Sequence, residues 1–121
     1  MVVVDSSGWI EYFRDGPKAD LYARYLKDPG RVITPAIVIY EVYKKLKREL
    51  GDEMAGTCLT WISKTCVVPV DQAIALMAAE LSLEFSLAMA DALVLATSRM
   101  SSAELVTSDA DFRKVPGVRV L

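Results

Sequence analysis

The chain has 121 residues, of which 53% are hydrophobic and 25% charged, and its net charge is −2. This composition is typical of one folded domain and excludes a disordered chain. The sequence contains no histidine, which excludes a Ser-His-Asp triad, a histidine acid–base pair and a histidine-ligated zinc site. If the protein catalyses a reaction, its carboxylates are therefore the expected catalytic groups.

The sequence offers no targeting or membrane signal. The N-terminus has no basic flank and reaches Asp5 at once, which argues against a signal peptide. The longest uncharged run, residues 54–63, is too short to span a bilayer. Cys58 and Cys66 have apolar neighbours, so we expect reduced core cysteines in a cytoplasmic protein, with a disulfide as the less favoured alternative.

The first element is a β-branched run, Val2–Val4, which predicts a buried parallel strand. Asp5 follows it, at the end of a strand where open α/β sheets place their ligands. Asp5 could also belong only to a helix-capping turn, and we expect Ser6 or Ser7 to cap the helix that follows. That helix carries an apolar stripe with helical spacing, formed by Trp9, Tyr12 and Phe13.

Residues 18–28 then predict a helix whose inward side chains are Leu21, Tyr25 and Leu26. A second short strand follows at residues 32–33. We expect Thr34 to be the N-cap of the next helix and Pro35 to open its first turn.

The helix after Pro35 contains one unexpected acid. Glu41 stands in an otherwise apolar run and lies one turn from Ile37 and Val38, so we expect it on their buried face. A salt bridge to Lys44 or Lys45 is the alternative explanation. The basic run at residues 44–48 is either a solvated helix face or a local phosphate-binding site.

The rest of the chain repeats the alternation of helices and strands. Asp71 is expected to be the N-cap of its helix. The predicted segments are a helix at residues 53–64, the strand Cys66–Val68, the helix Gln72–Phe85, a helix ending near residue 100, and strands at residues 105–106 and 118–121. This order predicts one α/β domain, residues 1–121, in which helices flank a mainly parallel sheet of about five short strands.

Asp91 is the only charge in the run of residues 87–97, where it shares a helix face with Leu87, Val94 and Leu95. Removing an ionised carboxylate from water destabilises the folded state by roughly several kcal/mol unless another group compensates the charge. No lysine or arginine lies within one helical turn. A proton, a metal ion or a distant arginine would compensate the charge, and the alternative is that Asp91 is only a structural cap.

Asp109 follows the strand at residues 105–106 just as Asp5 follows the first strand. In a parallel sheet these two strand ends can share one edge, and Glu41 and Asp91 would join them there. Clustered carboxylates about 4 Å apart repel by roughly 4 kcal/mol at an effective dielectric of 20. They persist by holding protons or cations, and all-oxygen ligands favour Mg²⁺ or Mn²⁺.

These motifs together resemble a known family. They are the early strand ending in Asp-Ser-Ser, the helix with Tyr-Glu-Val, the later Ala-Asp-Ala-Leu helix and the closing Val-Thr-Ser-Asp-Ala-Asp-Phe. In this order they resemble a PIN domain, and the small size and C-terminal segment resemble the VapC toxins of type II toxin–antitoxin pairs. The resemblance implies a PIN-like three-layer α/β sandwich.

The resemblance also implies function. It implies that Asp5, Glu41, Asp91 and Asp109 bind the metal and catalyse, with Asp111, Ser6 and Thr107 as accessory residues. Ser6 could instead be only a cap, and Asp111 only an acid of a first helical turn. The implied protein is a Mg²⁺- or Mn²⁺-dependent ribonuclease that acts on RNA, binds a cognate antitoxin and forms a homodimer. Without the four acids the net charge of −2 would become +2, so the remaining surface is slightly basic.

Three other interpretations stay open. The chain could be a non-catalytic PIN-like binding module, or an RNA-processing nuclease outside toxin–antitoxin systems. A Mg²⁺-dependent phosphatase or a receiver domain is a further alternative. The phosphatase would need Asp-x-Asp after the first strand, where Asp5 is followed by two serines. The receiver would need an acidic pair there and a lysine after a later strand, and both are missing.

Overall fold

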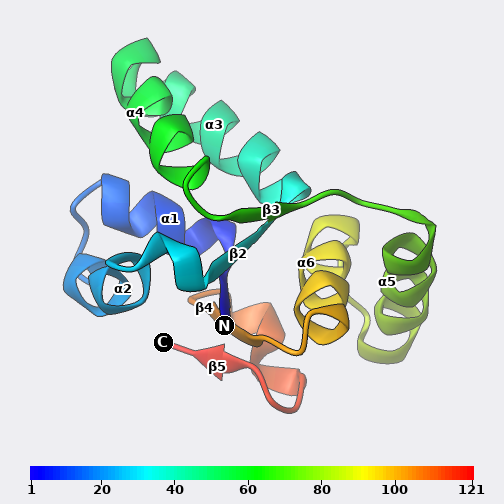
Figure 1. Ribbon diagram of the computed structural model, residues 1–121. Coiled ribbons are helices and arrows are strands. Elements are labelled where there is room, and N and C mark those ends of the chain that lie inside the picture. Colours follow the sequence, from blue (N-terminus) through cyan, green and yellow to red (C-terminus); the bar gives the residue numbers. More distant parts are fainter.

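A computed structural model describes residues 1–121, which fold around one five-stranded sheet (Figure 1). All strand pairs are parallel, and the strand order is β3-β2-β1-β4-β5. The strands are β1 Val2–Val4, β2 Val32–Pro35, β3 Cys66–Val68, β4 Glu104–Thr107 and β5 Arg119–Val120. The predicted α/β fold is therefore confirmed, and the sheet is entirely parallel.

Six α-helices flank the sheet and make it the middle of three layers. Helices α1 and α2 lie on one face and α6 on the other, with α5 packed outside α6, while α3 and α4 form a projecting hairpin (Figure 1). The helices are α1 Ser6–Phe13, α2 Ala19–Leu26, α3 Ala36–Leu50, α4 Asp52–Ile62, α5 Gln72–Phe85 and α6 Met89–Met100. Short 3₁₀ turns occur at Pro29–Arg31 and Ala110–Lys114.

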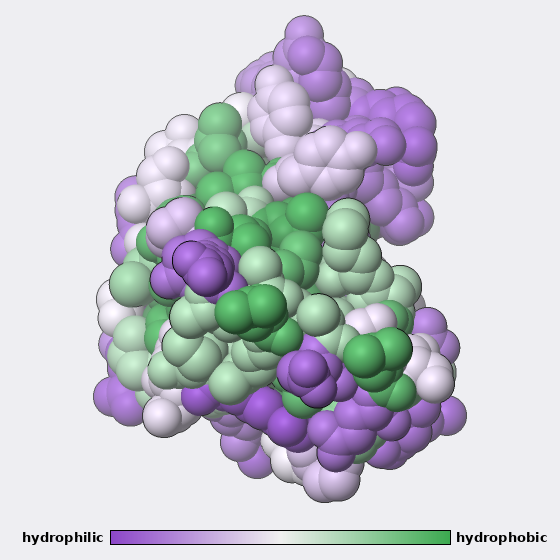
Figure 2. Space-filling model, turned by 90° about the vertical axis from the view of Figure 1, so that its right-hand side faces the viewer, coloured by the Kyte–Doolittle hydropathy of each residue, from purple (hydrophilic) through white to green (hydrophobic).

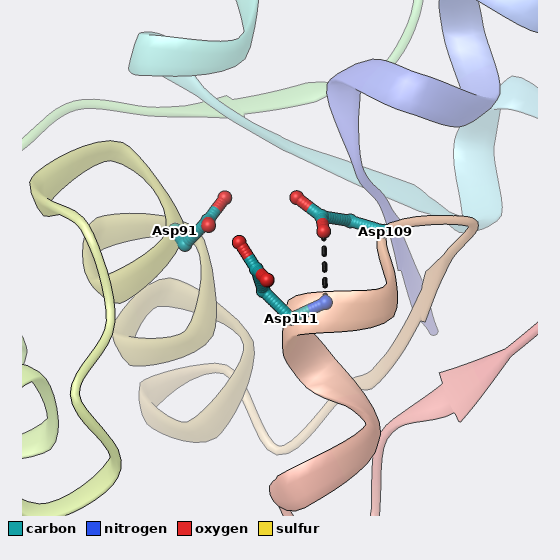
Figure 3. A group of neighbouring side chains, drawn as sticks. All are labelled: Asp91, Asp109 and Asp111. Atoms are coloured by element: carbon teal, nitrogen blue, oxygen red, sulfur yellow. Dashed lines mark hydrogen bonds between the residues drawn. The ribbon is translucent and has the colours of Figure 1, made fainter.

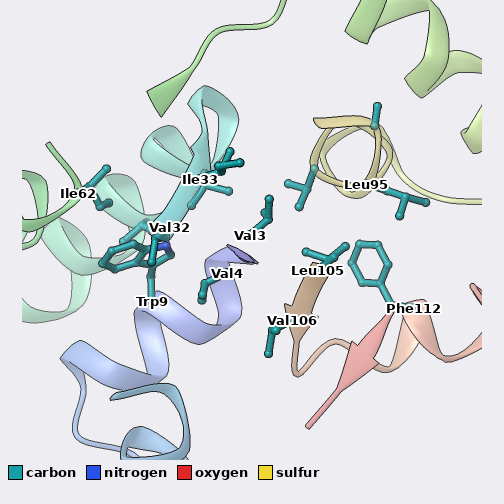
Figure 4. Packing of buried hydrophobic residues seen from close by; sticks show 14 of the residues in the cluster. Val3, Val4, Trp9, Val32, Ile33, Ile62, Leu95, Leu105, Val106 and Phe112 are labelled. Atoms are coloured by element: carbon teal, nitrogen blue, oxygen red, sulfur yellow. The ribbon is translucent and has the colours of Figure 1, made fainter. Parts of the chain in front are cut away.

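Alternation along the strands divides the core between the two faces of the sheet. Val3 is in register with Ile33 and Leu105, whereas Val4 is in register with Val106. Successive side chains of a strand point to opposite faces, so these two sets pack on different helix layers. In Figure 4 the first set lies beside Leu95 and Phe112, and Val4 lies on the side of Trp9.

The close approach of α1 to α2 and β1 depends on Gly8. A Cβ atom at this position would lie 2.3 Å from the ring of Tyr22 and 2.6 Å from a methyl group of Val4. Only glycine leaves room for both neighbours. The approach fixes the start of α1, and therefore the position of Asp5.

Several local predictions are wrong. Tyr22, not Leu21, is the inward residue of α2, because Tyr22 is fully buried and Leu21 is 40% exposed. Thr34 is not an N-cap: it lies in β2, its hydroxyl pairs with that of Thr65 over 2.7 Å, and α3 begins after Pro35 without a side-chain cap.

Two further corrections concern Asp5 and the cysteines. Asp5, not Ser6 or Ser7, caps α1, since its carboxylate accepts the Ser6 N–H over 2.8 Å. Both cysteines are free, as expected, but only Cys58 is in the core, and Cys66 is exposed on the edge strand β3. No single helix has the length and apolar composition to cross a membrane.

Candidate metal centre

The four predicted acids meet at one end of the sheet. Asp5 follows β1 and Asp109 lies two residues after β4, while Glu41 and Asp91 project from α3 and α6. All four line one pocket of 390 Å³. The remaining lining residues are Ser6, Ser7, Ile10, Tyr40, Lys44, Lys45 and Arg48. The prediction that the two strand ends share an edge is therefore confirmed.

Asp5 is held rigidly at the base of the pocket. It is 3% exposed, and one carboxylate oxygen accepts the Ser6 N–H while the other accepts the Thr107 hydroxyl over 2.8 Å. Thr107 also accepts the Asp109 N–H over 3.0 Å, so one hydroxyl positions both strand-end acids. The capping role of Asp5 is real, and it coexists with a place in the pocket.

The tightest group of acids includes a residue outside that pocket lining. Asp91, Asp109 and Asp111 offer carboxylate oxygens that all lie within 4.8 Å of one another, and the three side chains point toward a common centre (Figure 3). Asp109 also accepts the backbone N–H of Asp111 over 2.9 Å. The structure thus places Asp111 closer to Asp91 and Asp109 than its accessory status suggested.

Glu41 has no basic partner. The salt bridges of the protein are Arg14–Glu49, Lys47–Asp52 and Arg119–Glu104. The alternative explanation of Glu41, an ion pair with Lys44 or Lys45, is therefore wrong. Asp91 likewise lacks an arginine or lysine partner, so a distant arginine does not compensate it either.

Burial and mutual repulsion raise the pKa values of three of these carboxyls. The pKa of Asp91 rises from 3.8 to about 7, first through burial and then through Asp5, Asp109, Glu41 and Asp111. Burial likewise raises the pKa of Glu41, with Asp5 adding to the rise and Ser6 opposing it. Burial raises the pKa of Asp5 despite its hydrogen bonds to Thr107 and Ser6. The metal-free site therefore favours bound protons.

The donors present fit a hard divalent cation. Asp91, Asp109 and Asp111 offer only carboxylate oxygens to their common centre, and the neighbouring hydroxyls of Ser6, Ser7 and Thr107 add only oxygen. Mg²⁺ and Mn²⁺ prefer such oxygen ligands, and their charge would remove the repulsion that raises the pKa of Asp91.

One residue of this region was missed from the sequence. The hydroxyl of Ser7 accepts the Ser108 N–H over 3.1 Å and lies 3.3 Å from the Thr107 hydroxyl, which ties α1 to the end of β4. Its position two residues after Asp5, on the first turn of a helix, is the signal that could have identified it. The stripe on α1 is mainly core: Trp9 is fully buried, and Tyr12 and Phe13 pack against the core cluster.

Comparisons with known proteins agree with the fold. A toxin–antitoxin complex from Klebsiella pneumoniae has a TM-score of 0.84 at 24% identity, over 98% of this chain and 95% of that one. The sarcin-ricin-loop-cleaving toxin VapC20 from Mycobacterium tuberculosis has a TM-score of 0.80 at 22% identity, over 99% and 98% of the two chains. DNA-bound VapBC from Salmonella typhimurium has a TM-score of 0.79 at 18% identity, over 100% and 98%.

At these identities the solved structures establish the fold alone, and the search of curated proteins finds no match. The family itself is established by the PIN domain profile, which matches residues 2–118. That range contains every acid of the pocket as well as Asp111. The chain therefore belongs to the PIN-domain family.

Proposed function

We propose that this protein is a metal-dependent endoribonuclease and the toxin of a toxin–antitoxin pair. The observation that carries the proposal is a group of carboxylates around one pocket with no basic partner and with the pKa of Asp91 raised to about 7. An ordinary structural acid would cap a helix or pair with an arginine, and Asp91 does neither. The similarity of the fold to VapC20, a toxin that cleaves the sarcin-ricin loop, supports RNA as the substrate class.

The acids of the pocket and Thr107 have different roles in the proposed reaction. Asp91, Asp109 and Asp111 would hold a divalent ion between them, and Asp5 and Glu41, which line the same pocket, would complete its surroundings. Bound Mg²⁺ or Mn²⁺ lowers the pKa of water and stabilises charge on a phosphodiester, so no histidine base is needed. Thr107 keeps Asp5 and the backbone of Asp109 in place. Hydrolysis by water would leave 5′-phosphate and 3′-hydroxyl ends.

Two kinds of protein partner belong to the proposal. A cognate antitoxin is supported by solved relatives that are toxin–antitoxin complexes. A homodimer is supported by the apolar face over α5 and α6, which appears green in Figure 2. Leu83 of α5 is 82% exposed, and Met89 of α6 is 73% exposed. A cytoplasmic location remains part of the same proposal.

The test is a cleavage assay on purified protein with a labelled RNA, in Mn²⁺ and in EDTA. We expect cleavage only with the ion, products with 5′-phosphate ends, and growth arrest on expression without an antitoxin. A protein that binds RNA but leaves it intact would instead be the non-catalytic binding module. Cleavage without growth arrest would favour a processing nuclease outside toxin–antitoxin systems.

A further inference from the structure

One wall of the acidic pocket is basic and aromatic. Tyr40, Lys44 and Arg48 follow one another at four-residue spacing on α3, so their side chains form a row along the helix. All three line the acidic pocket and also a second groove of 590 Å³. We call this row the Tyr40–Arg48 wall. It joins the two hollows into one continuous surface.

The charges on this wall are not neutralised by the protein. Neither Lys44 nor Arg48 has a carboxylate within 4.0 Å, whereas their neighbour Lys47 pairs with Asp52 over 3.5 Å. Both side chains are exposed. Two free cations beside the proposed cleavage site would attract an anion that extends beyond the carboxylates.

The wall also presents aromatic ring faces. Tyr40 is 59% exposed, and the Lys44 ammonium lies 5.3 Å from its ring centroid and donates to its hydroxyl over 3.1 Å. Tyr43, in the same groove, is 37% exposed, with the Lys47 ammonium 5.6 Å from its ring. Exposed rings interleaved with cations are the combination by which proteins bind single-stranded nucleic acids, with bases on rings and phosphates on cations.

We propose that a single-stranded RNA crosses the Tyr40–Arg48 wall, with its scissile phosphate in the acidic pocket. The phosphates that flank the cut contact Lys44 and Arg48, and a neighbouring base stacks on Tyr40. This inference rests on the proposed ribonuclease function and adds the residues that hold the strand beside the cut. The strand must be unpaired there, because a base inside a duplex offers no free face to the ring.

The binding test uses fluorescein-labelled single-stranded RNA in EDTA, where no cleavage occurs, and fluorescence anisotropy over a series of KCl concentrations. The variant Lys44→Gln/Arg48→Gln removes two phosphate contacts, so the salt slope should fall by about 1.4 and the affinity in about 0.1 M salt by roughly 10- to 30-fold. The matched control is Lys27→Gln/Arg31→Gln. It removes two exposed cations from a separate hollow beside the first residues of β1 and β4, and should leave the affinity unchanged.

Stacking is tested separately with Tyr40. Because the ring is exposed, Tyr40→Ala should fold normally and lose about 5- to 100-fold in affinity with an unchanged salt slope. Tyr40→Phe keeps the ring and should retain the affinity. A fully paired duplex of the same sequence should bind more weakly than the single strand and should not respond to Tyr40→Ala.

The outcomes separate this inference from the nuclease proposal. Wall-dependent binding in EDTA without cleavage in Mn²⁺ supports the RNA surface and refutes the nuclease. If both wall variants bind RNA like the wild type and the protein still cleaves RNA, the proposed role of the Tyr40–Arg48 wall is refuted. The wall is also overturned if the wild type binds no RNA, or if the wall variants keep RNA binding and lose only a copurifying antitoxin.

Discussion

Replacing Asp91 with asparagine should stabilise the metal-free protein at neutral pH. The pKa of Asp91 is raised from 3.8 to about 7, so the folded state holds the proton more tightly than the unfolded state. Below pH 3.8 the carboxyl is protonated in both states and costs no stability. As the pH rises toward about 7 the unfolded state ionises first, so the free energy of unfolding falls across this window.

The size of the effect follows from two opposing contributions. The rise in pKa from 3.8 to about 7 corresponds to about 4 kcal/mol, and solvent screening of this half-buried side chain leaves about 2 kcal/mol. Asp91 also lies in the first turn of α6, where a carboxylate stabilises the helix by about 0.3–1 kcal/mol. Repulsion and burial outweigh this helix contribution. Asp91→Asn should therefore raise the free energy of unfolding by about 1–2 kcal/mol, or the melting temperature by about 3–8 °C.

The assay compares melting curves in EDTA at pH 5 and pH 8. The advantage of Asp91→Asn over the wild type should be larger at pH 8, where Asp91 is ionised. Asp20→Asn is the matched control, because Asp20 is also a first-turn acid but is exposed on α2, outside the pocket. It should lose about 0.3–1 kcal/mol through the helix dipole.

The same melting curves are then recorded with excess Mn²⁺. At about 100 times the dissociation constant, binding should stabilise the wild type by roughly 2.7 kcal/mol, and Asp91→Asn should lose most of this shift. If Asp91→Asn instead melts below the wild type in EDTA at pH 8 and keeps the full Mn²⁺ shift, Asp91 is a structural acid and not a metal ligand.

Substitutions at three other positions test packing and hydrogen bonds in and outside the site. Thr107→Val removes the hydroxyl that donates to one carboxylate oxygen of Asp5 and accepts the Asp109 N–H. It should cost about 1–3 kcal/mol in chemical denaturation, whereas Thr107→Ser should restore most of it. Gly8→Ala forces a methyl group against Tyr22 and Val4 and should cost about 1–3 kcal/mol; an unchanged denaturation midpoint would contradict the packing. Asp71→Ala removes the N-cap bond to Ile74 and should cost about 0.5–2 kcal/mol without affecting RNA cleavage in Mn²⁺.

The architecture was largely predictable because the chain alternates strongly apolar strands with helices whose ends are marked by capping and turn residues. The predicted helix Gln72–Phe85, with Asp71 as its N-cap, has the bounds found in the structure. The strand Cys66–Val68 is also as predicted, but sequence alone did not reveal that it is an edge strand. The exposure of Cys66 depends on strand order, which is a tertiary property.

The wrong predictions of the inward face of α2 and of the N-cap at Thr34 have local physical causes. Leu21 and Tyr22 are adjacent on α2, and the space beside Gly8 accepts the ring of Tyr22, which rotates Leu21 toward solvent. Threonine is a common N-cap residue, but the hydroxyl of Thr34 forms a hydrogen bond with that of Thr65 inside the fold. Such long-range partners leave no trace in a short sequence window.

The position of the site was predictable, but its internal arrangement was not. Charges isolated in apolar runs identified Glu41 and Asp91, and strand ends identified Asp5 and Asp109. The close grouping of Asp111 with Asp91 and Asp109 depends on the 3₁₀ turn after β4. The support from Ser7 and Thr107 depends on β1 and β4 being neighbours.

If the acids of this pocket hold the metal ion that the protein needs to cleave RNA, cleavage depends on them. This is measured by the rate of RNA cleavage in Mn²⁺ by the wild type, Asp109→Asn and Asp28→Asn; Asp28 is an exposed acid outside the acidic pocket. We expect cleavage by the wild type and by Asp28→Asn, and none by Asp109→Asn although it remains folded. Full cleavage by Asp109→Asn, or equal cleavage in EDTA, would contradict it.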